Sequence, residues 1–113
     1  MFEFRDRALN INIAGNEFIF EVDARIDRTI KRLSKEAVDI VKQYQDEKKT
    51  DDEVISAYKR YMSEILGDEA AADKIFANRE PDVRDCMDIL TYIANEIARF
   101  NQKSALTPIK GGK

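Results

Sequence analysis

Residues 9–22, LNINIAGNEFIFEV, alternate apolar and polar side chains on both sides of a Gly-Asn pair. Period-two alternation about such a two-residue loop predicts a β-hairpin, and this is the strongest constraint on how the chain can fold. With Gly15-Asn16 as the loop, Ala14 faces Glu17. The apolar pairs are then Ile13 with Phe18, Ile11 with Phe20 and Leu9 with Val22, all on one face. Because an isolated hairpin is only marginally stable in water, that face needs a cover from the rest of the chain.

The chain after the hairpin has the 3.6-residue periodicity of amphipathic helices. A first helix is predicted from about Ala24 to Glu47, with Asp23 as its N-cap. Thr50 to Glu53 has the spacing of a capping box, so a second helix should follow and end near Leu66, before Gly67.

Two further helices are predicted after Gly67. A short one should run from Asp68 to about Asn78, and Pro81 is placed at the first position of a last helix that ends around Gln102. The predicted fold class is α+β, mainly α, with the hairpin packed against three longer helices and one short helix. Residues 1–103 form one domain in this interpretation, and residues 104–113, which contain Pro108 and Gly111-Gly112, form a flexible C-terminal tail.

Composition excludes several functional classes. The formal net charge is −3, which argues against general nucleic-acid binding, and no apolar run reaches the length of a membrane span. There is no histidine, so the commonest general base and metal ligand are absent. The single cysteine, Cys86, cannot form an internal disulfide. No signal peptide is visible, and we expect a cytoplasmic protein.

No pattern in the chain indicates catalysis or a cofactor. Cys86 falls on the apolar face of the last helix, so a buried structural role is expected. The acids at residues 51–53 are explained by helix capping, whereas Asp82, Asp85 and Asp88 drift around their helix and do not converge as magnesium ligands must. We therefore expect no enzymatic activity, no cofactor and no metal.

Several residues are candidates for binding a protein partner. Residues 25–49 hold eight basic and five acidic residues, and the basic ones form a stripe along the first helix. This stripe is either a solvated helix face or a docking surface for an acidic partner. The N-terminal arm, residues 1–8, either pads the core with its phenylalanines or docks on another subunit. Together with three tyrosines, the candidate partner-binding residues are Phe2, Phe4, Arg25, Arg28, Arg32, Lys35, Tyr58, Tyr61 and Tyr92.

A hairpin of this form, ALNINIAGNEFIFEVDA, followed by amphipathic helices to Phe100 in a short acidic chain, resembles the small tail assembly chaperones of long-tailed phages of Gram-positive bacteria. The resemblance implies a protein of the host cytoplasm that binds the tape-measure protein and assists assembly of the tail-tube protein. It also implies absence from the finished virion and, in many members, a longer form made by translational frameshifting. It transfers no catalytic residue.

Other functional classes stay open beside that resemblance. A small cytoplasmic adaptor or regulatory protein would also bind its partner through apolar and charged side chains on its surface. A nucleic-acid-binding module is a weaker alternative. We also expect a homo-oligomer, because a two-stranded hairpin leaves both edges without a strand partner.

Overall fold

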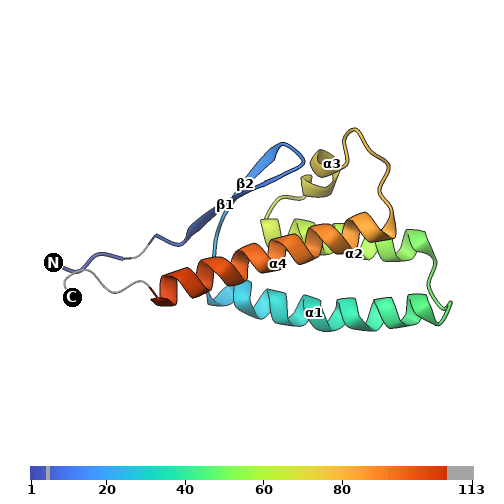
Figure 1. The fold of residues 1–113 in the computed structure, drawn as a ribbon, viewed down its shortest axis with the longest axis horizontal. Helices are drawn as coiled ribbons and strands as arrows, with labels where there is room; N and C mark the ends of the chain where they lie inside the picture. The colour runs from blue at the N-terminus through green and yellow to red at the C-terminus, as the bar shows by residue number, and fades with distance from the viewer. Residues whose placement is uncertain (5, 107–113) are drawn as a thin grey trace.

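The computed structural model describes residues 1–4 and 6–106, with side chains described to residue 103. It is an α+β fold, mainly α, as predicted. In the described residues, strands β1 (Ala8–Ile13) and β2 (Asn16–Glu21) precede helices α1 (Ala24–Gln45), α2 (Asp51–Leu66), α3 (Ala71–Ile75) and α4 (Val83–Leu106). The three long helices lie side by side, and the hairpin packs on α2 and α4, on the side away from α1, with α3 beside it on α2 (Figure 1).

The hairpin has the predicted faces but a different turn. Leu9 pairs with Phe20, Ile11 with Phe18 and Ile13 with Asn16, so the loop is Ala14-Gly15 and not Gly15-Asn16. Both loop residues have positive φ angles, 54° and 84°, as the favoured two-residue turns require. Moving the turn by one residue shifts the pairing by two, which leaves every side chain on its predicted face.

Side-chain hydrogen bonds explain why the turn moves. Asn12 Oδ1 accepts from the Gly15 backbone N–H at 3.0 Å, which supports the left-handed conformation of the loop. Asn16 is the first residue of β2 instead of a loop residue, and its side-chain Nδ2 donates to the Lys74 carbonyl at 3.1 Å. The tip of the hairpin is thereby fastened to α3, a contact that local sequence cannot reveal.

The first two helices begin as predicted. Asp23 Oδ1 accepts from the Ile26 N–H at 3.1 Å, and both bonds of the capping box between Thr50 and Glu53 are present. Gly67 ends α2 in the left-handed conformation. The first helix ends at Gln45, two residues earlier than predicted, because the chain turns through Glu47 with a positive φ of 61°.

The last two helices differ from prediction at their ends. The short helix has five residues, Ala71–Ile75, because Asp68 instead bonds the Ala70 N–H and the Lys74 ammonium. Pro81 is not the first residue of α4: Asp82 accepts from the Asp85 N–H at 2.7 Å, and the helix begins at Val83. The helix continues to Leu106, so residues 104–106 are not part of a tail, and residues 107–113 lie outside the described residues.

The core lies between the hairpin and the helices, with α2 at its centre. This helix packs against α1, α3, α4 and β2. Ile11 and Phe18 of the hairpin face are 3% and 4% exposed, and Val54, Met62 and Ile93 are completely buried. Across the described part of the chain, no helix is long and apolar enough to cross a membrane.

Candidate protein-binding surface

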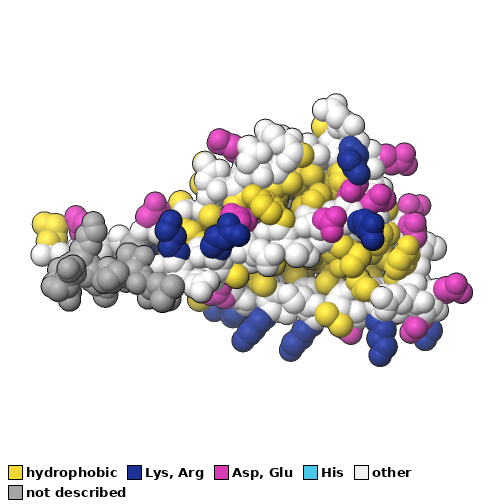
Figure 2. Space-filling view, viewed as in Figure 1, with side chains coloured by type: hydrophobic (Ala, Val, Ile, Leu, Met, Phe, Trp, Pro, Cys, Tyr) yellow, Lys and Arg dark blue, Asp and Glu magenta, His cyan; other side chains and the backbone are white. Residues whose placement is uncertain are grey.

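One face of α1 carries a row of four basic side chains, with the exposed Asp39 beside them between Lys35 and Lys42. Arg28, Lys35 and Lys42 recur every seven residues, and Lys31 lies between the first two, so the four side chains follow one side of the helix. We call this row the basic line. All four side chains are exposed, and none forms an ion pair with the residues that the structure describes. Figure 2 shows basic side chains projecting along the α1 edge of the molecule.

The predicted basic stripe is therefore divided in two. Arg28 and Lys35 belong to the basic line, and Arg25 is exposed close to the Asp23 carboxylate. Arg32 points to the other side, where it pairs with Glu64 of α2 and lies 3.9 Å from Glu36. Because Arg32 already has carboxylate partners within the fold, it contributes much less attraction for an outside acid than its neighbours do.

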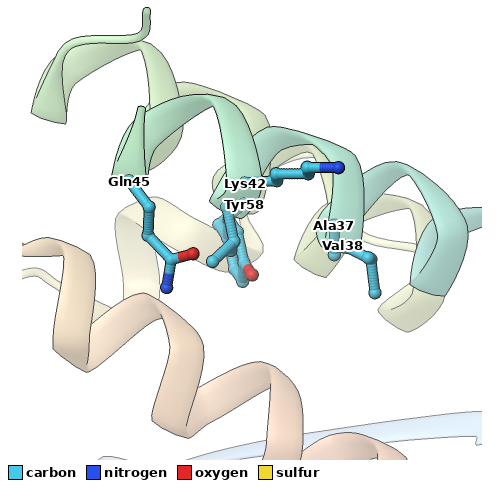
Figure 3. Close-up of a pocket in the computed structure, with 6 residues that line it drawn as sticks. Ala37, Val38, Lys42, Gln45 and Tyr58 are labelled. Carbon is cyan, nitrogen blue, oxygen red and sulfur yellow. The ribbon is translucent and has the colours of Figure 1, made fainter. Parts of the chain in front are cut away.

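Next to the basic line, the surface hollows into an apolar trough. Its walls come from the C-terminal half of α1 and its floor is Tyr58 of α2, giving a hollow of about 500 Å³ (Figure 3). We call it the trough, and its lining residues are Ala37, Val38, Val41, Lys42, Gln45 and Tyr58. Val38 is 68% exposed at its rim, which is high for a large aliphatic side chain. A second, shallower hollow of about 400 Å³ lies on the other side of Val38.

Helix α4 runs antiparallel to α1 (Figure 1), and the two are joined near one end, where Asn101 Nδ2 donates to Asp27 Oδ1 at 3.2 Å. On α4, Met87 is 38% exposed. Figure 2 shows hydrophobic side chains gathered between α1 and α4.

The predicted tyrosines occupy three different environments. Tyr61 is 2% exposed, and Arg60 stacks over its ring at 5.0 Å, so it is a core residue of this fold and not a surface residue. Tyr58 is 4% exposed and lines the trough. Burial raises the pKa of both hydroxyls. Tyr92 is 40% exposed on α4.

The N-terminal arm stands away from the core. Phe2 and Phe4 are 78% and 89% exposed, and their rings meet edge to face with centroids 4.9 Å apart. The interpretation in which these phenylalanines pad the core is therefore wrong for this conformation. The arm joins the fold at Arg7, whose carbonyl accepts from the Val22 N–H at 2.8 Å and whose guanidinium lies 3.5 Å from Glu21.

Cys86 and two of the acids singled out in the sequence, Asp82 and Asp85, have structural contacts in the fold. Cys86 is completely buried, as predicted, and burial raises the pKa of its thiol to about 11. Asp85 forms a two-bond ion pair with Arg79, at 2.7 and 3.0 Å. Among the residues that the structure describes, no three acidic or cysteine side chains are placed to hold a metal ion.

Of the residues that line the trough, sequence reasoning singled out Tyr58 and missed the five from α1, which are Ala37, Val38, Val41, Lys42 and Gln45. It also missed Lys31 of the basic line. The available signal was Val38, which falls among polar residues outside the apolar stripe of α1. Comparisons with protein-family models, with curated protein sequences and with solved structures found no match.

Proposed function

We propose that this protein is a tail assembly chaperone of a phage or prophage, which acts without catalysis in the bacterial cytoplasm. In this role it binds the tape-measure protein and assists assembly of the tail-tube protein around it. The observation that supports this proposal best is the basic line, four exposed cations without ion pairs in the described residues, running beside an apolar trough. An amphipathic helix with an acidic side is the ligand that such a surface fits.

Charge attraction on this surface is suited to rapid and reversible capture. Exposed charges contribute mainly to the rate of association and to the choice of partner, and salt weakens their effect. A chaperone that must release its client gains from such an interface, because each surface contact contributes little free energy by itself.

Co-expression with the tape-measure protein tests the proposal. The variant Arg28→Glu/Lys35→Glu should capture at least about tenfold less tape-measure protein than wild type, and raised salt should weaken wild-type capture. The matched control is Lys48→Glu/Arg84→Glu, which makes the same charge change at exposed positions away from the basic line. Equal losses in both variants would contradict a role for the basic line, and no capture by wild type would contradict the chaperone function.

A further inference from the structure

The outer edge of β1 carries backbone groups that no other strand pairs. In an antiparallel pair, bonded and non-bonded positions alternate, and the bond from the Val22 N–H to the Arg7 carbonyl sets this alternation. The backbone N–H and C=O groups of Asn10 and Asn12 therefore point away from β2. Both residues are exposed, and these groups have no hydrogen bond within the described residues. Such an edge accepts another extended segment as an added strand.

The two edges of the hairpin are not equivalent. On β2, the exposed Glu17 and Glu21 place charges that disfavour an added strand, whereas β1 has neither a charge nor a proline along its length. On the inner side, β1 packs on α4, and Figure 2 shows hydrophobic side chains exposed between the hairpin and that helix. Leu9 of β1 is only half-buried. A strand added to β1 therefore covers apolar surface as well as pairing backbone groups.

The position of α4 restricts what can occupy this edge. Paired strands lie about 4.8 Å apart, whereas packed helices need about 8 to 10 Å between their axes. Because α4 already packs against β1, the hairpin of a second copy would bring that copy's own α4 into the same space. A segment with no helix beneath it avoids this overlap. Within the described residues the arm is such a segment, since Phe2 and Phe4 are 78% and 89% exposed and Figure 1 shows it leaving the body of the molecule.

The arm cannot add to β1 of its own chain without a tight reversal. Arg7 is held in the hairpin by Val22, so the chain would have to turn within residues 5 and 6. Two-residue hairpin turns require positive φ angles and favour glycine, whereas these residues are arginine and aspartate. The Asp6 carboxylate instead accepts from the Ala8 N–H at 2.9 Å. The arm of a second copy needs no such turn.

We infer that the arm of a second copy of this chain adds to β1 as an antiparallel strand, with Glu3 opposite Asn10. Phe4 then lies beside Leu9, and both phenylalanines of the arm face α4. The same pairs recur in the opposite direction, so the two copies form a closed dimer. The phenylalanine rings bury roughly 500 Å² and cover about as much, which reaches the roughly 1,000 Å² of a specific interface. This inference does not rest on the proposed function.

Light scattering across concentration tests the dimer with the full chain. Wild type should show the mass of two chains in the micromolar range, and Phe2→Ser/Phe4→Ser should raise the dissociation constant at least about tenfold. Asn10→Pro should do the same, because proline removes the N–H that bonds the arm. Ile19→Pro is the matched control, since Ile19 pairs with Asn10 and its N–H points to the other edge of the hairpin. A single-chain mass for wild type, or equal dimerisation by the Asn10 and Ile19 variants, would overturn the inference.

Disulfide cross-linking locates the contact and does not depend on the proline variants. In Glu3→Cys/Asn10→Cys, mild oxidation should join two chains reciprocally, because bonded pairs of neighbouring strands have Cα atoms about 5.5 Å apart, within disulfide range. Glu3→Cys/Ile19→Cys is the control, since Ile19 lies one strand further away and should not cross-link. The native Cys86 is completely buried and does not compete. A disulfide confined to single chains, or none at all, would refute the pairing of the arm with a second copy.

Discussion

Three consecutive residues of β2 provide a sharp test of how the hairpin is buried. Phe18 is 4% exposed and pairs with Ile11, Ile19 is 64% exposed on the opposite face, and Phe20 is half-buried. Replacing a fully buried phenylalanine by alanine removes its transfer free energy and leaves a cavity, so Phe18→Ala should cost about 3 to 5 kcal/mol of unfolding free energy. Phe20→Ala should cost about half of that, because part of the ring stays in water.

The same substitution at Ile19 is the internal control. Its side chain loses little buried area, so Ile19→Ala should cost under about 1 kcal/mol, mostly as lost strand propensity. Urea unfolding followed by circular dichroism measures all three free energies. Because a domain of this size has about 5 to 15 kcal/mol in total, Phe18→Leu provides a milder variant with an expected loss of about 1 to 2 kcal/mol. A cost for Ile19→Ala equal to that of Phe18→Ala would refute the assignment of faces.

Two further predictions concern the helices. Thr50→Ala should lower stability by about 1 kcal/mol, because it removes the acceptor for the Glu53 N–H. The Thr50 N–H donates to the Glu53 carboxylate and holds its pKa below the usual value, so this contact stabilises the fold above the unfolded pKa and is lost as pH falls through the folded pKa. As the pH is lowered from neutral to acidic, the melting temperature should therefore fall less steeply in Glu53→Gln than in wild type. An unchanged acid dependence would count against this contact. Cys86, with a pKa of about 11 and no exposure, should react with a thiol reagent at pH 8 only as fast as the domain opens, and rapid labelling in native buffer would show that it is accessible.

The sequence by itself determined which faces of the hairpin and helices are apolar and where three helix ends lie. Period-two alternation fixed which side chains of the hairpin face inward, and that holds because a strand has two faces whatever it packs against. Asp23, Thr50 and Gly67 marked three helix ends, because a cap acts on backbone groups only a few residues away. The buried position of Cys86 followed from the apolar stripe of its own helix.

Three other features depend on contacts between residues that are far apart in the sequence, so only the tertiary structure decided them. The turn settles on Ala14-Gly15, and Asn16 is then held by the Lys74 carbonyl, 58 residues away. Arg32 leaves the basic surface because it meets Glu64 of α2, whereas Arg28 and Lys35 have no such partner in the described residues. The trough exists because the C-terminal half of α1 packs beside α2, whose Tyr58 forms its floor. No local pattern encodes that juxtaposition, since each helix alone shows only an apolar stripe and not the neighbour that covers it or leaves it open.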